Sequence, residues 1–384
     1  MHKLFFNRRN AGFHGTAGSA RFSLAVLALV SAVCFLTAGC TCLSAAGQKA
    51  GTSVTGNGHG SRQLKLVSWN VETFFDASTE GCEYEEFVGY KSLWNADKYK
   101  DRLKRLADYM KDENADIYCF MEIENEAVVL DISNQLQGSD AHGTKWKYAA
   151  FGKEAGTAIG CAVFSKLPLE SLTLHQIDYP VSLPSAAFEK RTAGTLLEPP
   201  VMRPLLEVRV NVAGSAPSSG GEPAAAAQDG TLVLFVCHWK SKSGNEAESA
   251  VWRNCQEALL TDRMQKALSK GAAVLACGDF NRGLSEFLWS YQEGFVELRG
   301  FSGTVPVESP WFASTQPGSY CYQGEWNKLD HIFTAGGTNL LSFRADTGGG
   351  LVKADGTPAG YSVATGKGYS DHLPLICTFT VSAQ

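Results

Sequence analysis

Leu275-Ala276-Cys277-Gly278-Asp279-Phe280-Asn281 is the stretch that decides the fold. The apolar run over 272–277 is unbroken and lies between two glycines, which is typical of a strand buried on both faces. Because side chains alternate along an extended chain, Asp279 and Asn281 leave on one side while Phe280 packs on the other. Ligands of open α/β sheets bind outside the carboxyl ends of strands, so the stretch indicates a site. A plain strand-to-turn junction uses the same residues and is the alternative.

Length and charge limit the class of protein. A chain of 384 residues allows one large domain or two ordinary ones, and its composition of 44% hydrophobic and 19% charged residues is close to that of globular proteins. The balance is mildly acidic, with 34 Lys+Arg against 39 Asp+Glu, and no polybasic tract occurs. The composition therefore argues against a protein that coats nucleic acid through charge alone. The composition is compatible with an enzyme that binds phosphate at one site through a metal ion.

The first 39 residues are typical of a signal peptide. Four basic residues precede the apolar run 22–36, which ends at Thr37-Ala38-Gly39-Cys40. Small residues before a cysteine resemble the lipobox of bacterial lipoproteins, with Cys40 as the lipidated residue. We therefore expect an exported chain anchored to a bacterial membrane or the cell surface, with residues 40–62 as a flexible tether. An uncleaved anchor and an ordinary signal peptide, which would leave the protein secreted or periplasmic, are the alternatives.

Residues 63–384 indicate one α/β domain. Buried strands are expected over Leu64–Trp69, Asp116–Met121, Lys147–Phe151, Thr157–Phe164, Leu205–Val212, Thr231–Cys237, 272–277, Leu329–Phe333 and Leu373–Thr380. Helices are expected after Asn95 and Asn245, both of which are suitable N-caps, and around Val128–Leu136. The low-complexity segment 213–230 lies between two strands and reads as a solvent loop.

The cysteines do not indicate a disulfide scaffold. Five of them lie inside apolar runs, where a free cysteine behaves as a small hydrophobe: Cys119, Cys161, Cys237, Cys277 and Cys377. No CxxC or Cys/His cluster suggests zinc. A single bridge, for example between Cys82 and Cys321, stays open.

Acids, amides and histidines follow or precede several strands. They are Asn70, Glu72, Glu122, His238, Asp279, Asn281, Asp330, Asp371 and His372. Each alone has an ordinary interpretation as a surface or turn residue. Together, oxygen ligands at strand ends suit a hard divalent ion such as Mg²⁺, and histidines without cysteine partners suit acid–base work.

These residues lie in six blocks: Trp69-Asn70-Val71-Glu72, Met121-Glu122, His238-Trp239-Lys240-Ser241-Lys242, Gly278-Asp279-Phe280-Asn281, Leu329-Asp330-His331 and Ser370-Asp371-His372-Leu373-Pro374. The set resembles the endonuclease/exonuclease/phosphatase (deoxyribonuclease I-like) superfamily over residues 64–380, in family order. The resemblance implies a four-layer α/β sandwich, in which two mixed β-sheets pack face to face with helices outside. The catalytic tyrosine of the apurinic-endonuclease branch has no counterpart in 156–166.

The resemblance also implies roles. Asn70, Glu72, Glu122 and Asp371 match metal-binding positions, and the expected ion is Mg²⁺, with Mn²⁺ or Ca²⁺ as alternatives. Asp279 matches the residue that orients or deprotonates the attacking water, Asn281 a phosphate or metal contact, and His372 a phosphate contact paired with Asp330. His238 matches the second histidine of the deoxyribonuclease I branch.

Basic residues near these blocks suggest a phosphate-facing patch. Lys240 and Lys242 have the same parity after His238, Arg253 follows them on the next helix, and Arg203 is a weaker candidate. Solvated surface charge is the alternative for all four. The expectation is a metal-dependent phosphodiesterase that cleaves DNA or RNA. The alternatives are a sphingomyelinase-like or inositol-phosphate-hydrolysing enzyme of the same fold, or an inactive surface binding protein. No protein partner can be inferred.

Overall fold

The computed structural model describes residues 3–9, 61–137, 145–177, 180–182, 196–213, 230–290 and 294–382. Two mixed β-sheets pack against each other at its centre. The first has the order β1 (Lys3–Arg9), β4 (Tyr148–Glu154), β5 (Gly160–Ser165), β3 (Ile117–Ile123), β2 (Arg62–Phe74), β19 (Leu375–Val381) and β18 (Thr338–Ala345). In it β1 pairs parallel with β4 and β2 parallel with β3, and the remaining pairs are antiparallel.

The second sheet carries the buried run that ends at Asp279. Its order is β12 (Leu288–Ser290), β13 (Phe295–Arg299), β14 (Thr304–Glu308), β17 (Asp330–Ala335), β11 (Ala273–Asp279), β10 (Thr231–His238), β9 (Leu205–Asn211) and β6 (Leu169–His175). The one parallel pair, β10 with β11, lies near its middle. Every residue of these two strands is buried, as expected for strands covered on both faces.

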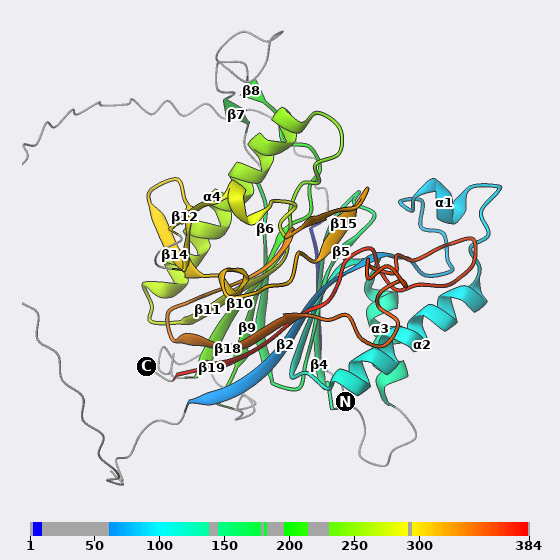
Figure 1. The fold of residues 1–384 in the computed structure, drawn as a ribbon, viewed down its shortest axis with the longest axis horizontal. Helices are drawn as coiled ribbons and strands as arrows, with labels where there is room; N and C mark the ends of the chain where they lie inside the picture. Colours follow the sequence, from blue (N-terminus) through cyan, green and yellow to red (C-terminus); the bar gives the residue numbers. More distant parts are fainter. Residues whose placement is uncertain are drawn as a thin grey trace, which may run out of the picture. The chain divides into compact units, whose positions relative to one another are not determined.

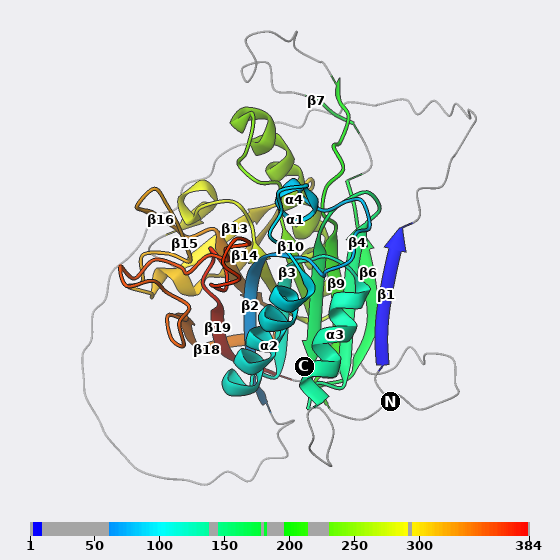
Figure 2. The ribbon, with the colours of Figure 1, turned by 90° about the vertical axis from the view of Figure 1, so that its right-hand side faces the viewer.

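Helices cover the outer faces of the two sheets. α2 (Ala96–Glu113) and α3 (Glu126–Gln137) lie on the first sheet, and α4 (Glu246–Leu268) packs on β11, β13 and β14 of the second (Figure 1). Figure 2 shows α2 and α3 side by side in front of β2, β3 and β4. The short α1 (Glu85–Val88) follows the β2 end. Helix, sheet, sheet and helix form four layers, which confirms the expected sandwich.

The two long helices begin where the sequence predicts. The Asn95 side chain accepts hydrogen bonds from the backbone N–H groups of Asp97 and Lys98, at 3.1 and 3.0 Å. The Asn245 side chain caps α4 in the same way. Such caps satisfy N–H groups that have no partner within the helix. They therefore fix where α2 and α4 start relative to the sheets.

The core between the sheets contains thiols. Cys119, Cys161, Cys277 and Cys377 are buried and free, and burial raises the pKa of the Cys119 thiol well above its ordinary value. These cysteines therefore pack as small apolar side chains, as predicted. The bridge that the sequence left open, between Cys82 and Cys321, is absent, because both cysteines are free.

Several strands at the margins of the sheets were not expected from the sequence. β6, β18 and the β12–β14 group lack a continuous apolar run, because only part of each is buried. Two small hairpins, β15 (Tyr320–Tyr322) with β16 (Glu325–Asn327) and β7 (Val181–Ser182) with β8 (Leu196–Leu197), were also not expected. Marginal strands bury one face or less, so their hydrophobic signal is weak.

The N-terminal segment differs from expectation in one respect. Lys3–Arg9 forms β1, parallel to β4, although residues 1–39 are predicted to be a signal peptide. A mature chain starting at Cys40 would lack β1 and leave β4 at the sheet edge. The rest of the predicted leader, most of the tether and residues 214–229 of the predicted loop lie outside the described residues. No helix among the described residues is long and apolar enough to cross a membrane.

Candidate active site

The candidate site lies where the carboxyl ends of β2, β3, β10 and β11 meet the starts of β17 and β19. In the second sheet, register places His238 opposite Asp279, and Asp279 opposite Asp330. In the first sheet, Asn70 is opposite Met121, the residue before Glu122. Strand pairing alone therefore brings the predicted residues of each sheet to one end of the sandwich.

Asn70 connects the site residues of the first sheet to those of the second. Its side-chain N–H₂ group donates to Glu122 Oε1 at 3.0 Å and to Asp279 Oδ2 at 3.1 Å. Its Oδ1 atom accepts from the Glu72 backbone N–H at 3.0 Å. Asn70 is only 2% exposed, so these bonds form away from water. One amide thus fixes two carboxylates that come from different sheets.

His372 and Asp330 form a buried ion pair. His372 Nδ1 donates to Asp330 Oδ2 at 2.7 Å, and the Ser319 hydroxyl donates to the same oxygen at 2.5 Å. Burial alone would lower the pKa of His372, but the carboxylates of Asp330 and Asp371 outweigh it and raise the pKa well above its ordinary value. The imidazolium therefore persists at neutral pH. Its Nε2 atom points toward Asp279 Oδ2, 3.9 Å away.

His238 has the opposite electrostatic character. Its Nε2 atom lies 3.6 Å from Glu122 Oε1 and 3.7 Å from Asp279 Oδ2, and its Nδ1 atom is buried with no hydrogen-bond partner. Burial, then Arg203 and His372, lower its pKa well below the ordinary value. His238 is therefore neutral. The two histidines of the site therefore differ: the surroundings of His372 favour the imidazolium, and those of His238 favour the neutral imidazole.

Three carboxyl groups of the site hold their protons unusually tightly. Burial and then Asp371 raise the pKa of Glu72 to about 7. Burial, with a smaller effect of Asp330 and against that of His372, raises the pKa of Asp279 to about 7. The pKa of Asp371 is raised by burial and then by Glu122. Buried acids that crowd one another in this way are relieved by a bound cation.

The donor set fits an ion such as Mg²⁺, which keeps waters and substrate oxygens among its ligands. It fits less well a metal whose ligands all come from the protein. Among the described residues, no three His, Cys, Asp or Glu side chains converge as a ready metal cluster. Mg²⁺ is ordinarily held by one or two carboxylates, waters and substrate phosphate oxygens. Glu122, Asp371, Glu72 and Asn70 provide oxygens of this kind at the crowded side of the site.

Arg102, which was not selected from the sequence, positions the turn that carries Glu72. It comes from α2, is 2% exposed, and donates to the carbonyl oxygens of Thr73 at 3.0 Å and Val71 at 2.8 Å, and also to that of Glu72. Glu72 and Thr73 have positive φ angles of 52° and 43°, which non-glycine residues rarely adopt. Three bonds from one guanidinium hold this strained turn, and with it the Glu72 side chain. In the sequence Arg102 is one of several basic residues of a helix, with no local signal.

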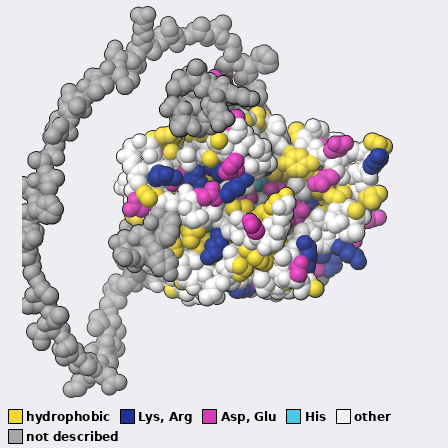
Figure 3. Space-filling view, turned by 45° about the horizontal axis from the view of Figure 1, so that its top comes forward, with side chains coloured by type: hydrophobic (Ala, Val, Ile, Leu, Met, Phe, Trp, Pro, Cys, Tyr) yellow, Lys and Arg dark blue, Asp and Glu magenta, His cyan; other side chains and the backbone are white. Residues whose placement is uncertain are grey.

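Seven of the nine predicted residues line a cavity of about 550 Å³, whereas Glu72 lines a different cavity and Asp330 is buried beside His372. Asn70, Glu122, His238, Asp279, Asn281, Asp371 and His372 all contribute. Tyr320 and Tyr322, from the unexpected β15 hairpin, also line it, and the Tyr320 ring lies 4.7 Å from that of His372. On the face shown in Figure 3, basic and acidic side chains are interspersed and no continuous basic tract is visible. This agrees with the absence of a polybasic segment.

The predicted basic patch is not one surface. Lys242 lines the cavity but is paired with Glu286 at 2.6 Å. Lys240 lines a neighbouring cavity instead, because the chain leaves the extended conformation after His238 and the parity argument no longer holds. Arg253 is 1% exposed and donates to the Lys240 carbonyl, to Ser249 and to Glu246. Arg253 therefore supports the loop from behind and does not face the cavity.

The comparisons with known proteins agree with this architecture. The family model described as "Endonuclease/Exonuclease/phosphatase family" matches residues 67–372, so the chain belongs to that family. None of the curated sequences compared with the chain matches it.

Several solved structures are similar to this chain at low sequence identity. Truncated TDP2 from Caenorhabditis elegans is 16% identical with a TM-score of 0.47, over 83% of this chain and 97% of that one. A family member from Bacteroides thetaiotaomicron is 13% identical with a TM-score of 0.49, over 84% and 97%. The catalytic domain of human Nocturnin is 15% identical with a TM-score of 0.45, over 83% and 95%.

Replacing Asp330 tests the ion pair. Asp330→Asn removes the main carboxylate that holds the proton on His372, so the pKa of His372 should fall. If activity needs the imidazolium, the alkaline limb of kcat/KM against pH should move to lower pH by about one unit or more. An unchanged limb with lowered kcat would mean that Asp330 only supports the fold.

Replacing Arg102 tests the positioning of Glu72. Arg102→Met removes the guanidinium donor from three carbonyls, so the Mg²⁺ concentration for half-maximal activity should rise roughly tenfold, at temperatures where circular dichroism shows a folded chain. Arg105→Met is the control, because Arg105 lies on the same helix and bonds the Gly366 carbonyl. Equal Mg²⁺ dependence in both variants would remove the positioning role.

Proposed function

We propose that the chain is a metal-dependent phosphodiesterase that hydrolyses DNA or RNA. The observation that carries this proposal is the hydrogen bond between His372 Nδ1 and Asp330 Oδ2, with His372 Nε2 3.9 Å from Asp279 Oδ2 in an open cavity. A histidine and a carboxyl group side by side at one cavity suit acid–base hydrolysis of a bound ester. Membership of the Endonuclease/Exonuclease/phosphatase family supports the same chemistry.

The residues divide the reaction between them. Asp279, once ionised, accepts a proton from the water that attacks phosphorus, and Asn70 fixes the orientation of its carboxylate. His372 donates a hydrogen bond to a phosphoryl oxygen, where negative charge increases in the transition state. Asn281, whose amide donates to the Trp239 carbonyl at 3.2 Å, contacts the phosphate from the side of β11. His238 is a neutral neighbour that orients Glu122 and Asp279.

Glu122, Asp371, Glu72 and Asn70 would hold the ion, which we take to be Mg²⁺, with Mn²⁺ or Ca²⁺ as substitutes. When bound, the ion supplies positive charge that stabilises the developing charge on the phosphate. Binding also favours the ionised carboxylates, so the three raised pKa values should fall when the ion enters.

Other activities are outcomes of the same test. A sphingomyelinase-like enzyme or an inositol-phosphate phosphatase would use the same residues on another phosphate ester. An inactive surface protein would have no use for a complete set of two histidines, crowded acids and a bridging amide. The complete set therefore supports catalysis over binding alone.

The same proposal includes export. The basic residues, apolar run and Cys40 of the leader support a lipoprotein signal, with residues 63–384 held outside the cytoplasm on the 40–62 tether. The absence of a disulfide among the described cysteines is compatible with either compartment.

The activity is tested by offering the purified protein plasmid DNA, RNA, sphingomyelin and inositol phosphates. We expect cleavage of nucleic acid that EDTA abolishes and Mg²⁺ restores. Asp279→Asn and His372→Ala should each lower kcat on the order of 10²-fold or more. Asp112→Asn, an exposed acid on α2, is the matched control and should behave like wild type. Cleavage of sphingomyelin with no action on DNA or RNA would overturn the nuclease assignment.

The anchor is tested separately. Cys40→Ser should release the protein from membranes of expressing bacteria or leave the precursor unprocessed, because no thiol remains for the lipid. Mass spectrometry of the membrane fraction reads out the modified N-terminus. A mature N-terminus at another residue, without lipid, would contradict the lipoprotein assignment.

A further inference from the structure

A second cavity, of about 310 Å³, adjoins the catalytic one. Its walls come from the α1 segment, the β4–β5 turn and the loop after β10, and they include Tyr84, Thr157, Met202 and Lys240. Arg203 and Ser241 line both cavities. A ligand bound at the catalytic residues can therefore continue past Arg203 into this second space.

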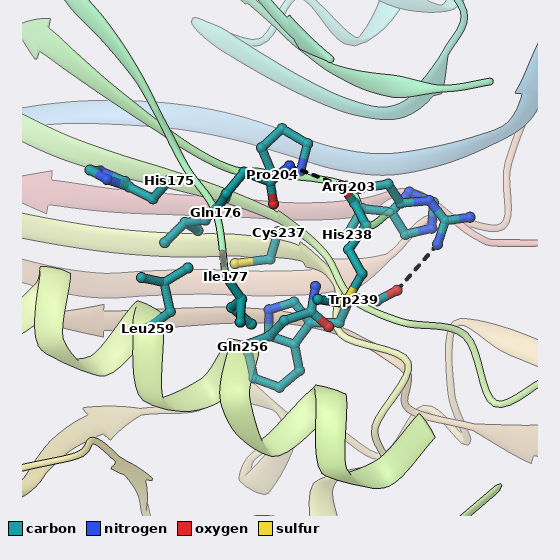
Figure 4. Close-up of a pocket in the computed structure, with 12 residues that line it drawn as sticks. His175, Gln176, Ile177, Arg203, Pro204, Cys237, His238, Trp239, Gln256 and Leu259 are labelled. Carbon is teal, nitrogen blue, oxygen red and sulfur yellow. Dashed lines mark hydrogen bonds between the residues drawn. The ribbon is translucent and has the colours of Figure 1, made fainter. Parts of the chain in front are cut away.

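Arg203 is tied to the catalytic residues through one carbonyl oxygen. The Trp239 carbonyl accepts a hydrogen bond from the Arg203 guanidinium at 3.4 Å and another from the Asn281 side chain at 3.2 Å. Figure 4 shows the Arg203 side chain directed at the Trp239 backbone beside His238. The guanidinium is thus fixed at the boundary of the two cavities, where it also interacts with the Tyr84 hydroxyl.

The charges of this cavity lack acidic partners. Lys242 and Arg253, which follow Lys240 in the sequence, are each paired with a glutamate. Over the ranges that the structure describes, neither Arg203 nor Lys240 forms an ion pair with a carboxylate. Burial, then Arg203 and Arg253, lower the pKa of Lys240, and Glu248 opposes this as the smallest effect, so the repulsion between these cations is only partly compensated within the chain. Two half-buried cations without a counter-ion attract an anion.

The rest of the cavity wall provides several hydrogen-bond donors, which suit a phosphate group. Burial raises the pKa of the Tyr84 hydroxyl against the opposing effect of Arg203, so the hydroxyl stays neutral and can donate a hydrogen bond. The Ser241 hydroxyl and the Arg203 fork add further donors. Several donors around one space match the oxygens of a phosphate group.

We propose that this second cavity binds a phosphate next to the one that is cleaved, in a nucleic-acid strand. This inference rests on the proposed function, because it assigns the first phosphate to the catalytic cavity. An inositol ring with several phosphates offers the same chemistry, whereas a phospholipid with a single phosphodiester does not. The second phosphate gives the enzyme a preference for a polymer over an isolated diester.

The test compares substrates that differ by one phosphate. Wild type is given the dinucleotide dTpdT and its forms with an added 5′- or 3′-phosphate, and inositol 1-phosphate beside inositol 1,4-bisphosphate. We expect one phosphorylated dinucleotide to have a kcat/KM roughly tenfold or more above that of dTpdT. This preference should fall toward unity in Arg203→Met and Lys240→Met. The ratio cancels any effect that a variant has on both substrates.

Lys270→Met is the matched control. Lys270 is exposed after the far end of α4, just before β11 begins, and its replacement removes the same charge away from both cavities. This variant should keep the full preference. If all three variants keep it while dinucleotides are hydrolysed, the subsite is wrong and the nuclease function stands.

A second measurement distinguishes failure of the proposed anion site from failure of the proposed nuclease function. Calorimetry with inorganic pyrophosphate should show binding that weakens roughly tenfold in Arg203→Met and Lys240→Met and is unchanged in Lys270→Met. If wild type ignores dinucleotides but this pattern holds, the proposed function fails and the anion site stands. A preference seen only for the inositol pair would likewise keep the site and overturn the nucleic-acid assignment. Pyrophosphate binding that is equal in all variants would overturn the site.

Discussion

The hydrogen bonds of Asn70 are the interaction on which the site depends. One buried amide donates to Glu122 of the first sheet and to Asp279 of the second. Without it, only the neutral His238 would lie between the two carboxylates. Burial, with a smaller effect of Asp330, raises the pKa of Asp279, and the hydrogen bond from Asn70 acts against this rise because it stabilises the ionised carboxylate. One side chain thus links the two sheets and positions two carboxyl groups of the site.

The surroundings of Asn70 are arranged by charge. The centre is crowded with acids and holds one cation, His372, whose proton is retained by Asp330. Arg102 reinforces the acid side from behind through backbone carbonyls, so its own charge is buried and its pKa is lowered to about 10. Arg203 and Lys240 lie at the margin with no carboxylate partner among the described residues. Positive charge at the margin can gather an anionic substrate, while the acidic centre favours a divalent ion.

Much of the fold could be predicted from the apolar runs of the buried strands. Most of the site could be predicted from the polar residues at the ends of those strands. β10 and β11 read as apolar runs, so the sequence alone places His238 and Asp279 at strand ends. Arg102 could not be selected in this way, because its importance lies in a tertiary contact with a strained turn. Arg253 was predicted to face phosphate, with surface charge as the alternative, but it is buried and contacts Glu246 and the Lys240 carbonyl. The marginal strands were missed because half-exposed segments carry little pattern.

We propose that a water oriented by Asp279 attacks phosphorus directly, on the side opposite the leaving group. The stereochemical course of hydrolysis tests this most directly. A nucleic-acid phosphorothioate of one configuration at phosphorus, hydrolysed in water enriched in ¹⁸O, should give a product of inverted configuration, because a single in-line displacement reverses the phosphorus centre. Retention of configuration would require two displacements through a covalent enzyme intermediate and would contradict the account.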